Sequence, residues 1–335
     1  MPSSVNRLRR RLLGAAFGLL AVVATGAVAA PAAAQTIIRI PHCCAAGSHF
    51  DVGAKRFAEL LAEKTGGKLK GEVFPGGQLG QETEVIQNVQ MGSIAATFIG
   101  HDPLAQFAPE TALLSQPYLF RDHGQALALL QGDLGKAFDE GLRKKGLRVL
   151  AWGDNGARVY TNSKHAIDKP ADLKGLKLRS PQSPVNLTVT RALGGIPVAM
   201  PYGEVYTALQ QGTIDGQENA VINIYPARLY EVQKHMAMTN HLLSFTVLIM
   251  NDRLFTSLPA DQQKAVQEAA TEATAHQSRF AAQQAEELTR KMEAQGVQVT
   301  RPDLAPFREA ALPIHEQYIG KAFSKDLYEM VRNAK

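Results

Sequence analysis

The feature that most constrains the fold is a long stretch near the C-terminus without helix-breaking residues. Between Pro259 and Gly296 the chain contains no proline or glycine and is rich in Ala, Gln, Glu and Lys, which are strong helix formers. At ~1.5 Å per residue, about 36 residues in one helix would extend roughly 55 Å, which is longer than a small domain. Its apolar positions are mostly alanine, so the buried stripe is thin. We therefore expect one long helix that lies across two domains, and a broken pair of helices is the alternative.

The first part of the chain alternates apolar strands with amphipathic helices. Strands are expected at 36–40, 68–74 and 93–100, and helices at 51–67 and 80–92. This strand–helix–strand–helix–strand order predicts a parallel sheet covered by helices.

The same alternation restarts in the middle of the chain. Strands are expected at 147–153, 158–164, 175–180 and 196–200, and helices at 183–195 and 202–212. Ser183 is predicted to cap the first of these helices, with Pro184 at its first position. The chain has 335 residues, which is enough for two domains. We therefore expect two α/β units, each with its own sheet.

The N-terminal residues 1–34 read as a secretory signal peptide. Four arginines (Arg7, Arg9, Arg10 and Arg11) precede an apolar segment at 12–30, and Ala32 and Ala34 have the spacing of a cleavage site. The mature chain would begin at Gln35, and an uncleaved membrane anchor is the alternative. Removal of four arginines and no acids leaves 36 − 4 = 32 basic residues against 31 acidic ones, a net charge of +1. Such a balance gives no support for nucleic-acid binding.

The two cysteines of the chain, Cys43 and Cys44, are adjacent. Neighbouring Cα atoms lie ~3.8 Å apart, below the ~4.4 Å at which ordinary disulfides begin, so a bridge between them would be strained. We expect two partly buried thiols, with a vicinal disulfide as the alternative. In either case the pair cannot link distant parts of the fold.

Polar residues gather near the ends of the expected strands, where open α/β sheets bind ligands. Arg179 ends one strand, Arg158 begins another, and Asn219 follows a third. An arginine presents a planar fork of donors that matches a carboxylate, and an asparagine adds a donor and an acceptor. Tyr202 can supply an apolar wall with a polar tip. Taken singly, each residue also has an ordinary structural explanation: a salt bridge for the arginines, a turn for Asn219 and core packing for Tyr202.

Sequence motifs of several enzyme classes are absent from the chain. There is no HExxH, no zinc-type Cys/His spacing, no GxSxG, no Walker loop and no GxGxxG. We therefore expect no catalytic residue, metal or cofactor.

Four stretches, at 74–92, 158–164, 173–185 and 200–220, carry a family likeness. They resemble the signature segments of DctP-type solute-binding proteins, which serve tripartite ATP-independent periplasmic (TRAP) transporters. The likeness runs from about Ile38 to the C-terminus, and its most specific part is YGEVYTALQQGTIDGQEN (202–219).

The resemblance implies an α/β fold of two lobes with a ligand cleft between them and a long helix that spans both. We expect lobe I at 35–155 plus 244–283 and lobe II at 156–243 plus 284–335. Arg179 matches the arginine that clamps the ligand carboxylate, and Arg158 matches a second basic contact. Further ligand contacts that the resemblance implies are Asn219, Tyr202, His42 and Glu82. Cys43 and Cys44 depart from the family pattern in their loop, and Gly100 stands where sialic-acid binders carry an acid.

The function implied is that of a periplasmic receptor that binds a small organic carboxylate and delivers it to a membrane TRAP permease. A C4-dicarboxylate, a hydroxy or oxo acid, an aromatic acid and a sugar acid all remain candidates for the ligand. We expect a monomer that binds no nucleic acid. The alternatives are a binding module for an ABC transporter or a sensor, and a periplasmic enzyme that acts on an organic acid.

Overall fold

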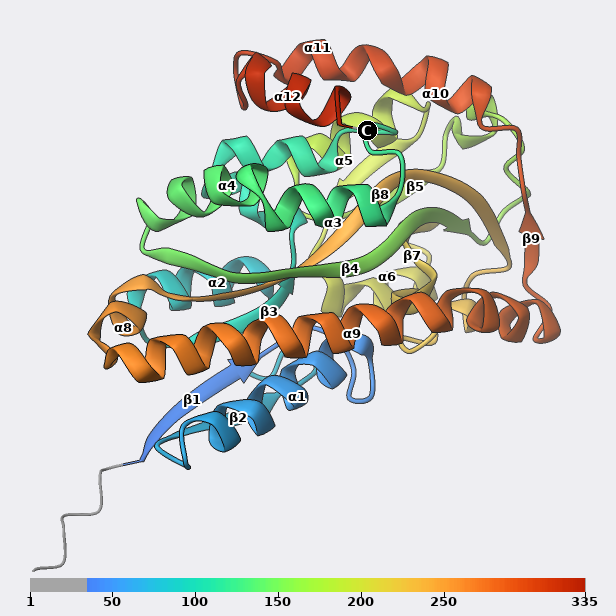
Figure 1. Cartoon of the computed structure of the whole chain (residues 1–335). Helices are drawn as coiled ribbons and strands as arrows, with labels where there is room; N and C mark the ends of the chain where they lie inside the picture. Colours follow the sequence, from blue (N-terminus) through green and yellow to red (C-terminus); the bar gives the residue numbers. More distant parts are fainter. Residues whose placement is uncertain (1–34, 335) are drawn as a thin grey trace, which may run out of the picture. The chain divides into compact units, whose positions relative to one another are not determined.

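The computed structural model describes residues 35–334, in which strands and helices alternate along the chain (Figure 1). The expected signal peptide, residues 1–34, lies outside the described residues. The strands are β1 (Thr36–Pro41), β2 (Leu69–Phe74), β3 (Ala96–Gly100), β4 (Leu147–Asn162), β5 (Lys177–Ser180), β6 (Ile196–Ala199), β7 (Gly216–Ala220), β8 (His235–Asn251) and β9 (Gln298–Thr300).

Helices of very different length connect these strands. The α-helices are α1 (His49–Lys64), α2 (Glu82–Met91), α3 (His123–Gln131), α4 (Asp133–Arg143), α5 (Pro184–Ala192), α6 (Val205–Gln210), α7 (Val221–Ile224), α8 (Asp252–Ser257), α9 (Ala260–Ala294), α10 (Ala305–Ala311), α11 (His315–Tyr318) and α12 (Lys325–Arg332). The 3₁₀ segments are η1 (Asp102–Gln106), η2 (Pro109–Ser115), η3 (Pro170–Leu173), η4 (Tyr202–Glu204), η5 (Leu229–Glu231) and η6 (Leu312–Ile314).

The strands form a small parallel sheet of β1 and β2 and a mixed sheet in the order β3-β8-β4-β7-β5-β6, with β9 paired to β8. Parallel pairing, as the alternation predicted, holds for β1–β2, β5–β6 and β5–β7. The prediction that β3 continues a parallel sheet is wrong, because β3 pairs antiparallel with β8. Strand β8 arrives about 150 residues later in the chain, so the local alternation carried no sign of this pairing.

Strand β4 corrects a second expectation. The two strands predicted at 147–153 and 158–164 are one continuous strand of 16 residues. Its pairing with β8 shifts register between Asp154 and Ala157. Such an irregularity bends a strand locally and re-aims its side chains. The polar sequence that suggested a break therefore marks a bulge inside β4.

Helix α9 is a single helix of 35 residues, as predicted, and the broken pair of helices is wrong. Its first half buries small residues such as Ala269 and Ala273 in a core shared with α1 and β1. Its second half buries Leu288 and Met292 in another core, shared with α6 and α7. Figure 1 shows α9 running beside β4, with α1 on its other side. One helix thus contributes to two separate hydrophobic cores.

The predicted start of α5 is also confirmed. The Ser183 hydroxyl accepts from the backbone N–H of Asn186 at 3.5 Å, and Pro184 is the first helical residue. The chain from Gln35 onward packs as one compact unit, so the lobe boundaries stay a prediction. Within the described residues, none of the helices is both long and apolar enough to cross a bilayer.

The buried amide of Gln277 on α9 offers a test of how this helix is held. Its Nε2 donates to the Asp154 carbonyl at 2.7 Å, and its Oε1 accepts from the Thr246 hydroxyl at 3.0 Å. Replacement of Gln277 by Ala leaves both partners buried and unpaired, so we expect a loss of about 3 kcal/mol in the free energy of unfolding. Urea denaturation measures it. Gln283→Ala, at an exposed position of the same helix, is the control and should stay within ~0.5 kcal/mol of the parent. Equal effects of the two substitutions would contradict this role of Gln277.

Candidate functional site

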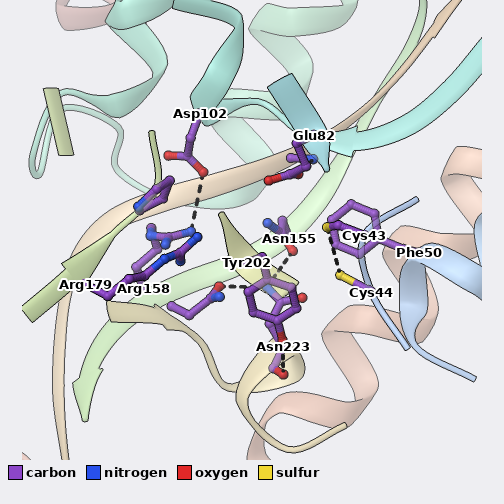
Figure 2. Close-up of a pocket in the computed structure, with 13 residues that line it drawn as sticks. Cys43, Cys44, Phe50, Glu82, Asp102, Asn155, Arg158, Arg179, Tyr202 and Asn223 are labelled. Atoms are coloured by element: carbon purple, nitrogen blue, oxygen red, sulfur yellow. Dashed lines mark hydrogen bonds and ion pairs between the residues drawn. The ribbon is translucent and has the colours of Figure 1, made fainter. Parts of the chain in front are cut away.

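A cavity lies where the ends of β1, β3, β5 and β7 approach the start of α2 and the bulge of β4 (Figure 2). The space between its lining residues amounts to about 320 Å³, which includes space open to solvent. The residues that line it are Cys43, Cys44, Phe50, Glu82, Gly100, Asp102, Asn155, Arg158, Arg179, Pro181, Tyr202, Asn219 and Asn223.

Arg179 reaches this cavity from the penultimate position of β5, close to the predicted strand end. It is only 2% exposed. Its Nε donates to the Met200 carbonyl at 2.9 Å, which fixes the guanidinium plane. Among residues 35–334, neither of its other two nitrogens has a hydrogen bond or an acidic partner within ion-pair distance. Burial, together with Arg158, lowers the pKa of Arg179 from its usual value. Arg179 is therefore a buried cation without an anion.

Arg158 lies inside β4, rather than at the start of a strand, and its charge is matched within the chain. Its Nε forms an ion pair with the Glu218 carboxylate, and its NH1 lies 3.4 Å from Asp102 Oδ2. Its NH2 donates to the Glu218 carbonyl at 2.9 Å. Burial alone would lower the pKa of Arg158, but Glu218 and Asp102 outweigh burial and raise it. Arg158 thus has acidic partners within the described residues, whereas Arg179 has none.

Asn219 and Tyr202 also line the cavity. Asn219 lies within β7, not beyond it as predicted, and its Oδ1 accepts from the Ala220 N–H and from Asn223 Nδ2, both at 2.9 Å. Its own Nδ2 has no partner in the part of the chain that the structure describes. The Tyr202 ring centroid lies 5.8 Å from the Arg179 guanidinium carbon, and its hydroxyl donates to the Asn223 carbonyl at 2.8 Å.

Glu82 lines the cavity, whereas His42 does not. Glu82 is the first residue of α2, and its Oε1 accepts from the Gly100 N–H at 2.9 Å. Burial, with a contribution from Asp102, raises the pKa of Glu82. His42 is 1% exposed and lies behind the cavity, with Nε2 3.4 Å from Asp51 Oδ1. In its place Cys43 and Cys44 reach the cavity, as free thiols with their sulfur atoms 3.6 Å apart.

Three polar residues of the cavity were missed by the sequence analysis: Asp102, Asn155 and Asn223. Asn155 Oδ1 accepts from His49 Nε2 at 2.8 Å and from Asn223 Nδ2 at 3.0 Å, and its Nδ2 donates to Ser244 Oγ at 2.9 Å. Asp102 lies two residues after the end of β3, where the strand-end rule could have found it. Asn223, inside the short helix α7, gave no signal in the sequence.

No metal site accompanies this cavity within residues 35–334, where no three His, Cys, Asp or Glu side chains gather in a way that could hold an ion. The lining residues offer charged groups and hydrogen-bond donors and acceptors.

Arg158 is paired with acids and Arg179 is not, so substitution of the two arginines should affect the stability of the ligand-free protein differently. Arg158→Met leaves the carboxylates of Glu218 and Asp102 buried without their cation, so we expect a loss of about 3–5 kcal/mol in the free energy of unfolding. Arg179→Met removes an unpaired buried charge and should be neutral or stabilising. Both are measured by urea denaturation after ligand removal by unfolding and dialysis. A similar loss in both variants would contradict the assignment of charges.

Buried His49 predicts a pH dependence of stability. Burial lowers its pKa from 6.5 to about 4 in the folded chain. In the unfolded chain His49 is therefore protonated below about pH 6.5, whereas in the folded chain it is protonated only below about pH 4. This residue should cost about 2 kcal/mol of stability between pH 7.5 and 5. In His49→Gln that part of the loss should disappear, while the exposed control His276→Gln should lose stability as the parent does. Urea denaturation of the parent and both variants at pH 7.5 and pH 5 measures these losses.

Comparison with known proteins agrees with this geometry. Residues 41–321 match the family model of DctP, described as bacterial extracellular solute-binding protein, family 7. The chain is 39% identical to a solute-binding protein of Verminephrobacter eiseniae, over 91% of each chain. It is 37% identical to the 2,3-diketo-L-gulonate-binding periplasmic protein of Escherichia coli, over 77% of this chain and 79% of the relative.

A crystal structure of a similar protein has the same fold. The TRAP periplasmic solute-binding protein of Polaromonas sp. JS666, bound to D-erythronate, superposes with a TM-score of 0.87 at 33% identity, over 90% of this chain and 99% of that one. The predicted two-lobed α/β fold is thereby confirmed. The chain belongs to the DctP family of bacterial extracellular solute-binding proteins, the receptors of TRAP transporters.

Proposed function

We propose that this chain is a periplasmic TRAP receptor that binds a small organic carboxylate in the cavity and delivers it to the membrane permease. The observation that carries the proposal is the unpaired guanidinium of Arg179. A buried charge is stable only when it is paired, and a ligand carboxylate would supply both the charge and the acceptors for its two free nitrogens. The relatives named above bind a gulonate derivative and erythronate, which are both carboxylates.

The other lining residues take supporting roles in this proposal. Asn219 offers its free Nδ2 to a ligand oxygen, and Tyr202 forms a wall beside the carboxylate. Arg158 adds positive potential while Glu218 and Asp102 hold it in place. Glu82 faces the part of the ligand away from Arg179. His42 positions the loop that carries the two thiols, through its contact with Asp51.

Contacts across the mouth of the cavity support a closed receptor. Gln182 accepts from the Thr83 hydroxyl at 3.2 Å, and its carbonyl accepts from Gln106 Nε2 at 2.6 Å. The Gly203 N–H donates to Gln81 Oε1 at 3.2 Å. We propose that these bonds break when the lobes open. A ligand that binds the closed form more tightly then shifts the population toward that form.

Transport, rather than catalysis, fits the chemistry of the cavity. An enzyme here would need Cys43 or Glu82 as nucleophile or base. The hydrogen bond with Cys44, together with burial, raises the pKa of the Cys43 thiol and keeps it protonated, which makes it a poor nucleophile. We further propose that the receptor is a monomer, exported with a cleaved leader. Ligand recovered unchanged after long incubation would support the transport role.

Substitution of Arg179 tests the proposal. A thermal-shift screen of D-erythronate, D-galactonate, D-glucuronate and succinate identifies a binding acid, because a ligand held only by the folded state raises the melting temperature. Calorimetry with that acid should show Arg179→Ala weakened by about 100-fold or more, because the carboxylate loses its buried partner. Arg179→Lys should also bind poorly, since a point charge does not reproduce the fork.

The control is Arg191→Ala, at an exposed position of α5, which should bind like the parent. Near-normal affinity in Arg179→Ala, with the fold intact by circular dichroism, would remove Arg179 from the mechanism. Failure of every acid to raise the melting temperature of the parent would count against the proposed function itself.

A further inference from the structure

The charges around the cavity are distributed unevenly. Arg179 is the only cation of the described cavity lining without an acidic partner, since Arg158 is matched by Glu218 and Asp102. Figure 2 shows Glu82 on the far side of the cavity from Arg179, next to Cys43, with Asp102 between them along one wall. The end of a ligand that lies away from Arg179 therefore meets carboxylates and thiols.

Hydrogen-bond acceptors without donors are also found among the lining residues. Both amide hydrogens of Asn223 are used, by Asn155 Oδ1 and Asn219 Oδ1, at 3.0 and 2.9 Å. Its own Oδ1 is buried and has no donor among the described residues. Glu82 accepts one backbone N–H, from Gly100, although a carboxylate has about four acceptor positions. A buried acceptor left without a donor is costly, so a ligand that donates hydrogen bonds would be favoured here.

A carboxylate and a hydroxyl differ in the property that matters at this end of the cavity. An ionised carboxylate only accepts hydrogen bonds, whereas a hydroxyl both donates and accepts. A second carboxylate on the ligand would face Glu82 and Asp102 with no free cation, and the donors there would be the thiols and the second amide hydrogen of Asn155. A hydroxyl in the same place would give its hydrogen to Glu82. Burial and Asp102 already raise the pKa of Glu82, which indicates how poorly the site tolerates another negative charge.

We infer that the ligand is a hydroxylated monocarboxylate, with its single carboxylate on Arg179 and its hydroxyls on Glu82 and Asn223, and that Glu82 is the residue that rejects acids with a second carboxylate. The inference rests on the proposed function, because it takes Arg179 as the carboxylate anchor. It adds the chemical class of the ligand and names the residue that sets it.

Matched acids test the inference directly. D-Erythronate and meso-tartrate differ only in a terminal CH₂OH or carboxylate, and D-galactonate and galactarate differ in the same way at greater length. We expect the monocarboxylate of the pair that fits to bind the parent protein at least about tenfold more tightly than its dicarboxylate, by calorimetry at pH 7.5. Butyrate or hexanoate, the acid of equal length without hydroxyls, should also bind at least about tenfold more weakly.

Glu82→Gln is the decisive variant, because it removes the charge and keeps the size and the acceptor for Gly100. The dicarboxylate should gain about tenfold in affinity, and the monocarboxylate should change by no more than about threefold. Glu84→Gln, an exposed acid two residues later on α2, is the matched control and should leave the ratio of affinities unchanged.

The outcomes separate this inference from the proposed function. If the dicarboxylate binds the parent as tightly as its partner, or if Glu82→Gln leaves the discrimination intact, the inference is overturned. In either case, loss of acid binding in Arg179→Ala would still support the proposed function. If neither the hydroxy acids nor the plain acids bind, both the inference and the proposed function fail.

Discussion

The site depends on one charge that the protein leaves unmatched. Among the other charged groups of the cavity, Arg158 lies between Glu218 and Asp102, Asp102 also accepts from Asn186 at 2.9 Å, and Glu82 accepts from the Gly100 N–H. Arg179 is fixed by the Met200 carbonyl alone. A cation that already has acidic partners gains little from a bound anion, whereas a cation without such a partner strongly favours an anionic ligand. Arg158 therefore stabilises the structure around the cavity, while Arg179 provides the affinity for an anionic ligand.

The strands that hold the fold together also hold this site. Strand β4 supplies Asn155 from its bulge and Arg158 three residues later, and β8 supplies Ser244, which anchors Asn155, and His241, 3.5 Å from Glu218. Helix α9 reaches the same bulge through Gln277, which binds the Asp154 carbonyl. Three long elements, β4, β8 and α9, thus fix one part of the cavity, while Cys43, Cys44 and Pro181 reach it from loops.

Much of this arrangement could be predicted from local sequence, and the failures have physical causes. Helix α9, the cap of α5 at Ser183 and the position of Arg179 follow from propensity, capping and strand-end rules that act over a few residues. The pairing of β3 with β8 joins segments about 150 residues apart, which no local pattern encodes. His42 was expected in the cavity because the family resemblance implies a ligand contact in the loop after the first strand, and a resemblance locates a loop but not the direction of a side chain. There the backbone turns, with the Gly77 N–H donating to the His42 carbonyl at 3.0 Å, and the next two residues face the cavity instead.

Selectivity in such a site follows from the exclusion of water more than from the number of contacts. In the proposed closed receptor, the bonds of Gln182 to Thr83 and Gln106, and of Gly203 to Gln81, hold the chain together beside the lining residues Pro181, Glu82 and Tyr202. In an open cleft, water would satisfy Glu82 and the Asn223 oxygen whatever the ligand, and a mismatched group would cost little. In the closed cavity only the ligand can supply the missing donors and the missing anion, so each mismatch carries its full desolvation penalty. Closure therefore converts a set of weak polar preferences into discrimination, with an anion required at Arg179 and hydrogen-bond donors required at the opposite end.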